Sequence, residues 1–543
     1  MLRKIRLTLA FLFWVLITWL LVDFTGTAQA YLGWMAKIQL VPALLALNIG
    51  ALLFVGALTL LMGRIYCSVI CPLGVMQDAI AWLNRKKNRY RFSPAKTTLR
   101  FTVLVLACAA LALGIAWVGA LIFPYSTYGR IVATCVAPLY KLANNGLAAL
   151  AEHYGSYAFY EVDVWLKSTS ALIVTLLTWL VIALLAWRGG RTWCNTICPV
   201  GTLLGLLSRQ ARLKMVIDAD KCRKCRKCEH GCKASCIDLK TLTVDYTRCV
   251  VCGNCTSDCQ FGAIRFTSAL PDGCGMDAKE RKGDEKTADE KRAGEKTVEE
   301  RPATAGAATA TEEKEGRRAV LTSIALLAGA AMTKAQNKIE PKTTDGGLAD
   351  IIQKEKSKRT KLITPPGSLS IRNLRSHCTA CQLCVDACPN DVLRPSSSLD
   401  RFMQPEVSYE RGYCRPECTR CGDVCPTSAI HPVTVEERTA IQVGHAEYIR
   451  ELCIPVRDGK PCGLCARKCP SGAIQMVPLQ AGVHRDGNRW RDADNQEIPF
   501  DKVLLIPAIN AERCIGCGAC ENLCPSSPLS AIYVEGHEVH REI

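Results

Sequence analysis

The chain has 543 residues, which is too long for one compact core and predicts several folding units. Its formal net charge of +17 leaves a nucleic-acid surface and a membrane surface open until the basic residues are located. The 32 cysteines exceed what packing requires, and 49% hydrophobic residues exclude a disordered protein and a small disulfide-stapled toxin. Metal or cluster binding is therefore the leading explanation for the cysteines.

Four long apolar stretches occupy the first part of the chain. They are Leu7 to Val22, Leu40 to Met62, Phe101 to Phe123 and Ala171 to Trp187. Each is close to the ~20 residues that a membrane-spanning helix needs, so we predict an α-helical membrane domain of four transmembrane helices over residues 1–214. Buried helices of a soluble core rarely run this long without a charge. A cleaved signal peptide ending at Ala28-Gln29-Ala30 is the weaker alternative for the first stretch.

Positive charge indicates the orientation of this domain. Lysines and arginines precede the first stretch, separate the second from the third and follow the fourth, whereas Asp23 to Ile38 and Pro124 to Ser170 are poor in them. Because translocated loops avoid lysine and arginine, both ends of the domain are expected in the cytoplasm of a bacterium, with the chain a multi-pass protein of the inner membrane. The basic excess is then topological, and no nucleic-acid partner is expected.

The rest of the chain divides by composition. Residues 215–275 are rich in cysteine, and residues 276–316 are a charged, low-complexity run that predicts a disordered linker. Residues 317–335 contain Arg317-Arg318 and the apolar run Ala319 to Met332, a pattern typical of a twin-arginine export signal or an anchor helix. An amphipathic or buried helix is the alternative. Residues 336–543 form a second cysteine-rich domain, which we expect in the periplasm.

Twenty-four cysteines form six blocks of four with the spacing of [4Fe-4S] ligands. Residues 215–275 contain Cys222, Cys225, Cys228 and Cys232, and Cys249, Cys252, Cys255 and Cys259. Residues 336–543 contain Cys378, Cys381, Cys384 and Cys388; Cys414, Cys418, Cys421 and Cys425; Cys453, Cys462, Cys465 and Cys469; and Cys514, Cys517, Cys520 and Cys524. We therefore predict α+β domains of the bacterial-ferredoxin type that hold about six [4Fe-4S] clusters.

In a bacterial ferredoxin each cluster takes three cysteines from one block and the fourth from the other. This arrangement predicts Cys222, Cys225 and Cys228 with Cys259, and Cys249, Cys252 and Cys255 with Cys232. Lys233 and Gln260 stand where proline usually follows the fourth cysteine, and Cys236 could replace Cys232. Zinc ribbons and disulfides are the alternatives, but a triple CxxCxxC followed by Cys-Pro is not a usual zinc spacing.

Four further cysteines form an internal repeat after the second and fourth apolar stretches. Residues 63–74 and 190–201 share a Gly-Arg pair, an aromatic residue, a Cys-x3-Cys-Pro motif and a glycine, and the cysteines are Cys67, Cys71, Cys194 and Cys198. Two thiols one helical turn apart suit a soft metal ion, a redox-active disulfide or a pocket wall. We expect the four to converge on one quinol or metal site. A helix-capping repeat is the alternative.

These motifs resemble two known families. Residues 1 to about 270 resemble the NapH-type membrane ferredoxins of periplasmic nitrate reduction, and residues from Arg317 onward resemble the NapG/MauM-type exported four-cluster ferredoxins. The resemblance implies a fusion of the pair, a quinol dehydrogenase component that takes electrons from the membrane quinone pool. It implies delivery to a periplasmic oxidoreductase such as nitrate reductase, or to a cytochrome acceptor. The departures are the first ferredoxin without Cys-Pro, the step from Cys453 to Cys462 and the internal position of the arginine pair.

Missing motifs narrow the function. The apolar stretches contain no histidine, the chain has no Cys-x-x-Cys-His, and no Gly-x-Gly-x-x-Gly loop occurs, which argues against haem and against a nicotinamide donor. The cofactors would carry the chemistry. The alternative function is copper or other soft-metal handling by the Cys-x3-Cys-Pro loops during assembly of a respiratory enzyme. The four-cluster domain counts against it, and the 24 intact ligand positions count against a mere scaffold.

Overall fold

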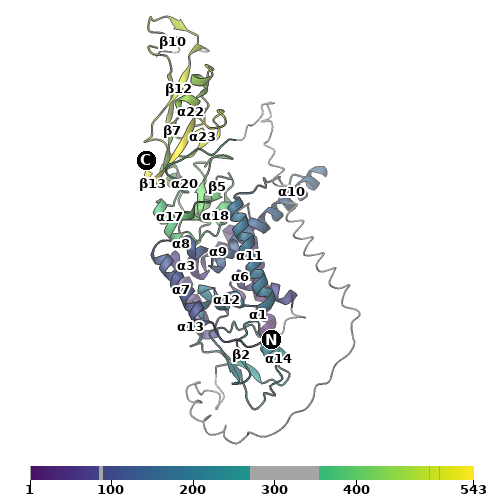
Figure 1. The fold of residues 1–543 in the computed structure, drawn as a ribbon. Coiled ribbons are helices and arrows are strands. Elements are labelled where there is room, and N and C mark those ends of the chain that lie inside the picture. The colour runs from purple at the N-terminus through teal and green to yellow at the C-terminus, as the bar shows by residue number, and fades with distance from the viewer. Residues whose placement is uncertain (1, 85–89, 269–353, 488, 500–501) are drawn as a thin grey trace, which may run out of the picture.

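The computed structural model describes residues 2–84, 90–268, 354–487, 489–499 and 502–543. The described chain is a long rod, with a helical domain in the middle and one cysteine-rich domain at each end (Figure 1). The predicted linker at 276–316 and the twin-arginine segment at 317–335 lie outside the described residues. Both remain predictions.

Two helices in the described part of the chain are long and apolar enough to cross a membrane. They are α1 (Leu2–Val22) and α11 (Thr169–Gly189), and they coincide with the first and fourth apolar stretches. The apolar helices α4 (Ile49–Met62) and α7 (Thr97–Ala112) are shorter. Two of the four predicted spans are thus continuous helices, and the four-helix membrane domain remains a prediction.

The other two apolar stretches are each divided by a local break. The second stretch forms α3 (Leu40–Leu45) and α4, and the Asn48 side chain caps α4 by accepting a hydrogen bond of 3.1 Å from the backbone nitrogen of Ala51. The third forms α7 and α8 (Ala116–Ala120), separated at Gly114, whose φ of +71° ends the first helix. Hydropathy alone did not indicate these breaks.

Shorter helices connect the apolar ones. They are α2 (Thr27–Lys37), α5 (Tyr66–Val69), α6 (Pro72–Leu83), α9 (Pro124–Ile131), a π-helical turn (Val132–Val136), α10 (Ala137–His153), α12 (Thr192–Thr196) and α13 (Pro199–Ser208). The helices α6 and α13 each begin with the proline of a Cys-x3-Cys-Pro motif, where proline fits because the first backbone nitrogen needs no intrahelical partner.

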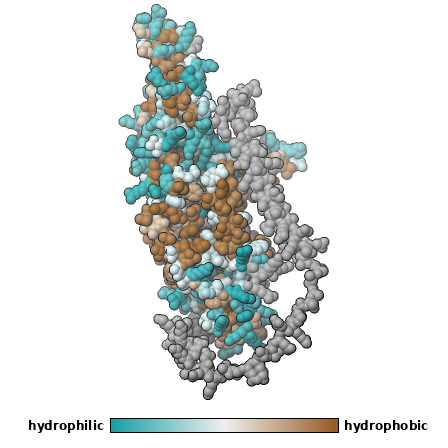
Figure 2. All heavy atoms as spheres, in the orientation of Figure 1, coloured by the Kyte–Doolittle hydropathy of each residue, from teal (hydrophilic) through white to brown (hydrophobic). Residues whose placement is uncertain are grey.

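An apolar belt crosses the middle of the rod. Figure 2 shows hydrophobic residues gathered over the central helices, with hydrophilic residues toward both ends. Phe11 on α1, Val105 on α7 and Leu177 on α11 are exposed. A soluble monomer rarely exposes so large a contiguous apolar patch, and such a belt is typical of a lipid-facing surface.

The first cysteine-rich domain is small. The strand β1 (Lys214–Ile217) pairs antiparallel with β4 (Ile264–Thr267), and β2 (Ile237–Asp238) pairs with β3 (Thr243–Val244). Its two short helices are α14 (Lys227–His230) and α15 (Asn254–Asp258). Cysteines form much of its core beside a few aliphatic side chains such as Met215 and Ile264, so this domain depends on what the cysteines bind.

The second cysteine-rich domain has two lobes. The lobe beside the helices contains α17 (Ile371–His377), α18 (Leu383–Ala387), the paired strands β5 (Leu393–Pro395) and β6 (Pro405–Val407), α19 (Arg420–Asp423) and α20 (Val435–Ala440). The outer lobe contains the pair β7 (Ile441–Tyr448) and β13 (Ile532–Glu542), the pair β8 (Ile474–Pro478) and β12 (Leu505–Ile509), and the helices α21 (Ile454–Arg457), α22 (Leu464–Arg467) and α23 (Ala519–Asn522). A small sheet of β9 (His484–Asp486), β10 (Arg489–Arg491) and β11 (Glu497–Ile498) forms the tip (Figure 1).

Both cysteine-rich domains contact the helical domain through the backbone. At one end the backbone nitrogen of Arg191 donates to the carbonyl of Lys233 at 2.9 Å. At the other end Lys167 pairs with Asp386 at 2.5 Å, and a Cβ atom at Gly129 would lie 2.5 Å from the carbonyl oxygen of Cys381. Only glycine permits this approach of α9 to the second domain.

Candidate cluster sites and the paired thiol site

The first cysteine-rich domain brings its cysteines together around two hollows. One hollow is lined by Cys222, Cys225, Cys228 and Cys259. The other is lined by Cys232, Cys236, Cys249, Cys252 and Cys255. Each hollow therefore takes three cysteines from one block and the fourth from the other, which is the crossed arrangement that the spacing predicts.

Left-handed backbone conformations shape the ligand loops. In four of the six blocks, the residues immediately before and after the middle cysteine both have positive φ, namely Lys224 and Arg226, Val251 and Gly253, Ala380 and Gln382, and Gly516 and Gly518. Such φ values are uncommon for residues other than glycine and mark strained positions. The reversals fold each loop around its middle cysteine, so that its three thiols share one hollow. This strain indicates that the loops are built to surround a group.

A second backbone signature concerns the fourth cysteine of five of the six blocks, all but Cys524. Cys259, Cys388, Cys425 and Cys469 are each followed three residues later by a residue with positive φ, namely Gly262, Asp391, Ser428 and Gly472. Ser235 stands in the same relation to Cys232, with φ of +51°. The sulfur of Cys236 lies 3.5 Å from that of Cys232. Backbone geometry therefore favours Cys232 as the equivalent of the other fourth cysteines, with Cys236 beside it.

The inner lobe of the second domain repeats the crossed arrangement. Burial and then the neighbouring thiols of Cys378, Cys381 and Cys425 raise the pKa of Cys384. Burial and then Cys414, Cys388 and Cys418 raise the pKa of Cys421. These neighbours define two sets, Cys378, Cys381, Cys384 with Cys425 and Cys414, Cys418, Cys421 with Cys388.

The outer lobe has the same crossed arrangement, although the spacing from Cys453 to Cys462 is longer than in the other blocks. Burial and then Cys462, Cys524 and Cys453 raise the pKa of Cys465 to about 12. Burial and then Cys514 and Cys469 raise the pKa of Cys517 to about 12, and Cys520 has Cys517 and Cys514 as neighbours. The sets are therefore Cys453, Cys462, Cys465 with Cys524 and Cys514, Cys517, Cys520 with Cys469.

The six sets fit cube-shaped clusters. Among the described residues, no three histidine, cysteine or acidic side chains converge tightly enough to hold a single metal ion. In the first domain the thiols instead line two hollows, as the corners of a [4Fe-4S] cube require. Backbone nitrogens approach the sulfurs, for example that of Ala380 at 3.4 Å from Cys378 Sγ and that of Ile430 at 3.5 Å from Cys425 Sγ. Cysteine binds iron as the thiolate, so loading these thiols releases protons.

The sites of the two lobes are joined through short contacts. The backbone nitrogen of Cys414 donates to the carbonyl of Cys517 at 2.9 Å. Tyr409 Oη donates to the carbonyl of Gly516 at 2.5 Å. Arg438 lies fully buried and its Nη2 donates to Cys414 Sγ at 3.2 Å. Two neighbouring ligand sets thus share a wall, which suits electron transfer between them.

The four cysteines of the internal repeat also come together, and we call Cys67, Cys71, Cys194 and Cys198 the paired thiol site. All four side chains are buried. Burial and then Cys194, Cys71 and Cys67 raise the pKa of Cys198. The thiols of the two loops therefore lie near one another, and a shared quinol or metal site stays a prediction.

Each loop of the paired thiol site receives the arginine of the other loop. Arg64 Nη2 donates to the carbonyl of Cys194 at 3.3 Å and lies 3.9 Å from Cys67 Sγ, whereas Arg191 Nη1 donates to the carbonyl of Cys67 at 2.6 Å. A Cβ atom at Gly74 would lie 2.6 Å from Arg191 Nη1, and one at Gly201 would lie 2.8 Å from Arg64 Nη2. The glycine of each motif makes room for this exchange. The two halves are therefore related by an approximate twofold axis.

Asp78 breaks this symmetry. It lies on α6 and accepts from Arg191 Nε at 2.8 Å and from Arg6 Nη1 at 2.9 Å, with Lys233 Nζ at 3.4 Å. Burial opposes its ionisation, but Arg191 first and then Lys233 and Arg6 hold the pKa of Asp78 well below its usual range. The matching position on α13 is Gly205.

The paired thiol site lies directly beside the first ferredoxin-like domain. Arg64 Nη1 donates to the carbonyl of Thr247 at 2.9 Å, two residues before Cys249. Asn195 Nδ2 donates to the carbonyl of Ala234 at 3.3 Å, two residues after Cys232. Gln77 Nε2 donates to Cys194 Sγ at 3.2 Å. Arg64 thus contacts both a paired thiol and a loop around the second hollow, and Asn195, which accepts from Arg64, contacts the other loop.

Family comparisons assign iron–sulfur domains to most of these segments. A model of a 4Fe-4S binding domain matches residues 43–90 and 171–216, so each match contains one Cys-x3-Cys-Pro loop. A 4Fe-4S dicluster domain matches residues 377–443 and 460–527, and another 4Fe-4S binding domain matches residues 242–265. The chain therefore contains several 4Fe-4S binding domains.

Curated relatives are ferredoxin-type proteins. A methylamine utilization ferredoxin-type protein MauM from Methylobacillus flagellatus is 31% identical over 172 residues, which are 30% of this chain and 64% of the relative. The ferredoxin-type proteins NapF and NapH of Escherichia coli are each 26% identical, over 32% and 43% of this chain and 87% and 71% of their own lengths. No solved structure matches. The chain is an iron–sulfur protein similar to ferredoxin-type electron-transfer proteins.

Proposed function

We propose that the chain is a membrane-bound electron conduit that oxidises membrane quinol and passes the electrons through [4Fe-4S] clusters to a periplasmic reductase. One observation carries this proposal. Six four-thiol sites stand at the two ends of a helical domain with an apolar belt, and the paired thiol site lies within that domain (Figures 1 and 2). A conduit across a membrane needs this arrangement, whereas a soluble ferredoxin does not.

The six crossed sets of cysteines would hold the clusters. Bound [4Fe-4S] clusters supply single-electron transfer at potentials that the surrounding protein sets. The ligand loops exclude water from the buried thiols, and the backbone nitrogens near Cys378 and Cys425 would donate to cluster or thiolate sulfur. The protein side chains therefore position the cofactors and tune their potentials.

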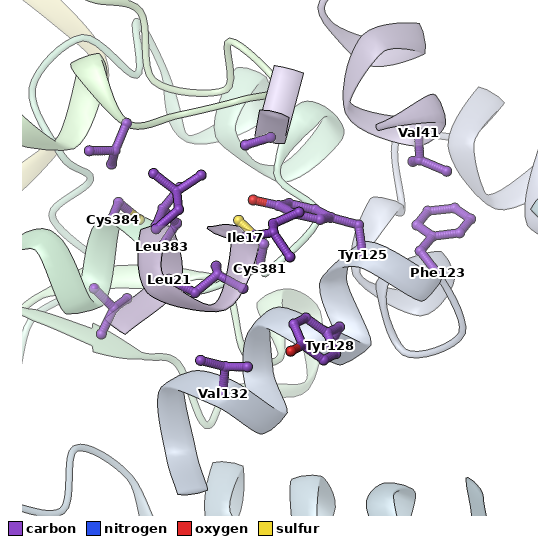
Figure 3. Close-up of a cluster of buried hydrophobic side chains, with 14 of the residues drawn as sticks. Ile17, Leu21, Val41, Phe123, Tyr125, Tyr128, Val132, Cys381, Leu383 and Cys384 are labelled. Carbon is purple, nitrogen blue, oxygen red and sulfur yellow. The ribbon is translucent and has the colours of Figure 1, made fainter. Parts of the chain in front are cut away.

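The contacts indicate an order along the rod. Arg64 and Asn195 connect the paired thiol site to the first domain by hydrogen bonds to its backbone carbonyls. At the other end of the helical domain, Tyr125 of α9 lies beside Cys381, and Ile17 and Leu21 of α1 pack near Leu383 and Cys384 (Figure 3). The inner and outer lobes then meet at Cys414 and Cys517. We infer that electrons follow this order from the helical domain to the tip.

Charge supports the sidedness of the conduit. The basic N-terminus of α1 lies at the end that carries the first domain, because Arg6 pairs with Asp78 there and Arg3 lies against Gly253. The second domain lies at the opposite end of α1, beside Leu21. If the basic end faces the cytoplasm, the second domain faces the periplasm. A segment before residue 354 must then bring the chain across the membrane.

The redox balance of the proposed reaction is simple. A quinol becomes a quinone by losing both electrons and both protons. Clusters held by the six cysteine sets would accept these electrons singly, and the protons would pass to water at the polar end of the helical domain. An acceptor protein that docks at the outer lobe would take the electrons, which would return the protein to its oxidised state.

A second candidate function is thiol-based reduction and handling of copper during assembly of a respiratory enzyme. The proximity of four cysteines at the paired thiol site favours it, because thiolates select Cu(I), although in this structure no three of the described side chains there lie close enough to hold one ion. The second domain has no evident part in that function. The two candidates differ in what loss of a paired thiol should do.

Reduction kinetics of the full-length protein in lipid nanodiscs test the proposal. Anaerobically purified protein should contain about 24 iron atoms and as many sulfides per chain. A short-chain quinol should reduce the clusters, Cys67→Ser should abolish that reduction, and dithionite should still reduce the variant. The matched control is Cys108→Ser, an exposed cysteine on α7. Stoichiometric zinc, or cluster reduction that quinol never drives in the unmodified protein, would refute the conduit.

The same preparation separates the second candidate. Loss of bound copper in Cys67→Ser, with quinol-driven reduction unchanged, would favour metal handling. A reporter fused to the C-terminus tests sidedness, and we expect a periplasmic reading. A cytoplasmic reading would replace the transmembrane conduit with a single cytoplasmic six-cluster unit.

A further inference from the structure

A large cavity lies where α1 and α6 meet the first ferredoxin-like domain. Its volume is about 870 Å³, within the range of cavities that bind small molecules. One wall is apolar and aromatic and includes Phe11, Trp14 and Trp82. The facing wall is polar and includes Lys227 and Asn254. The cavity therefore suits a molecule with a polar head and an apolar body.

The cavity opens toward the apolar belt. Phe11 on α1 is 63% exposed and Trp82 on α6 is 65% exposed, although both line the cavity. Leu7, one turn before Phe11, is exposed too. Side chains of this kind face lipid in a membrane protein. A lipid-soluble molecule could therefore enter sideways and leave its tail along α1.

The polar wall adjoins the second hollow of the first domain. Lys233 follows Cys232 in the chain, and Asn254 precedes Cys255. An added Cβ at Gly253 would lie 3.4 Å from the backbone of Arg3 on α1, so the ligand loop and the helix are in contact at the cavity. A molecule in the cavity would lie against the loop around Cys252, Cys255 and Cys232.

One buried donor at the cavity is free to bind such a molecule. The side chain of Arg6 is 2% exposed and its Nη1 donates to Asp78. Its Nε has no acceptor among the described residues. A buried donor without an acceptor is unfavourable, and an oxygen acceptor that reaches it from the cavity would relieve this. Quinone rings carry such oxygens and stack on aromatic side chains.

We propose that this cavity is the quinone site of the protein, with the ring between Trp82 and the polar wall and the tail along Leu7 and Phe11. The proposal rests on the proposed function, because it assigns the place where quinol delivers electrons. It separates that place from the paired thiol site: the cavity binds the quinone, and the paired thiols lie next to it, joined through Arg191, which pairs with Asp78 at the cavity and donates to the carbonyl of Cys67. Aromatic walls and contact with a ligand loop favour a quinone over a membrane phospholipid.

Photoaffinity labelling with an azido-quinone tests the site in nanodiscs of phosphatidylcholine. Ala79→Phe fills the cavity from α6, and Trp82→Ala removes its aromatic wall. The matched control is Ala109→Phe, an exposed position on α7 outside the cavity. We expect the label on α1 or α6 in the unmodified protein, and about tenfold less of it in both cavity variants. Cys67→Ser should be labelled normally.

The rate of cluster reduction by quinol provides the second measurement. It should fall about tenfold in Ala79→Phe while dithionite reduction stays unchanged. Equal labelling and equal rates in Ala79→Phe and Ala109→Phe would overturn the site. Label on other helices, or a retained phospholipid with no label on α1 or α6, would overturn it too. Correct labelling without quinol-driven reduction would support the cavity and refute the conduit.

Discussion

Arg191 Nη1 lies 2.6 Å from the carbonyl oxygen of Cys67, a residue of the other Cys-x3-Cys-Pro loop. Arg64 returns the contact by donating to the carbonyl of Cys194. A helix-capping repeat would satisfy each loop from within its own half. This exchange instead ties the two loops together, so neither loop can move without the other. The repeat therefore forms one site.

The positive charge of Arg191 stabilises the ionised carboxylate of Asp78 more than any other neighbouring charge does. We expect Arg191→Met to lower the stability of the helical domain by about 3–5 kcal/mol, because it removes one partner of a buried ion pair and leaves the carboxylate under-compensated. Asp78→Asn in the same chain should restore part of the loss. Thermal unfolding in nanodiscs measures both effects. Additive losses in the double variant would show that Asp78 does not depend on Arg191.

The spacing of the cysteines predicted the crossed sets of the first domain, and both hollows have the predicted members. The spacing could not decide whether Cys232 or Cys236 is the fourth ligand. In the structure both thiols line the same hollow. The deciding signal is the left-handed Ser235, which spacing does not encode, since serine has no preference for that conformation. Backbone strain at ordinary residues is visible only in the structure.

The ligand assignment gives a direct prediction. Cys232→Ser should remove one cluster and lower the iron content from about 24 to about 20 atoms per chain, whereas Cys236→Ser should leave it unchanged. Iron analysis and the electron paramagnetic resonance spectrum of the reduced protein measure the difference. Iron loss in Cys236→Ser alone would assign the fourth ligand to Cys236.

Arg438 should tune one cluster of the inner lobe. Its buried guanidinium donates to Cys414 Sγ, and a positive donor stabilises the more negative, reduced state of a cluster. We expect Arg438→Gln to make the potential of that cluster more negative by roughly 60 mV or more, since a charge-assisted hydrogen bond is worth about 1.5–3 kcal/mol. A redox titration followed by electron paramagnetic resonance measures it. Arg394→Gln, which loses a surface-side pair with Glu410, is the control.

Other parts of the site could not be read from the sequence. Asp78, Gln77 and Arg6 are polar residues in or beside apolar helices. That position was the only feature of the sequence that could have pointed to them. Asp78 meets Arg191 and Lys233, and Gln77 meets Cys194, all over 100 residues away, whereas Arg6 meets Asp78 across 72 residues. The breaks at Asn48 and Gly114 were hidden because hydropathy averages over them. Contacts distant in sequence are set by tertiary packing, which local patterns do not carry.

The contact between the helical domain and the second domain depends on Lys167 and Asp386. Both are largely buried, and Lys167 Nζ also donates to the carbonyl of Val385 at 2.8 Å. Asp386→Lys should therefore slow electron transfer into the second domain while quinol still reduces the first. Stopped-flow spectra measure the two phases. The charge-swapped pair Lys167→Asp and Asp386→Lys should recover the rate, and equal rates in all three proteins would place the transfer elsewhere.

His540 should make the junction between the two lobes of the second domain sensitive to acid. It lies on β13, where Thr364 Oγ1 is 2.8 Å from its Nε2, and burial first, then Arg438 and His537, lower the pKa of His540 to about 4. Because the unfolded pKa is near 6.5, the unfolded segment binds the proton first as pH falls. The stability of the pair β7 and β13 should be full above pH 6.5 and should decrease by up to about 3 kcal/mol as pH falls from 6.5 toward 4.

His540→Gln should remove this pH dependence and keep a polar partner for Thr364. Hydrogen exchange of β13 at pH 7 and pH 5, compared between the variant and the unmodified protein at each pH, measures it. The exposed His484→Gln serves as the control, and equal pH dependence in all three proteins would contradict the assignment.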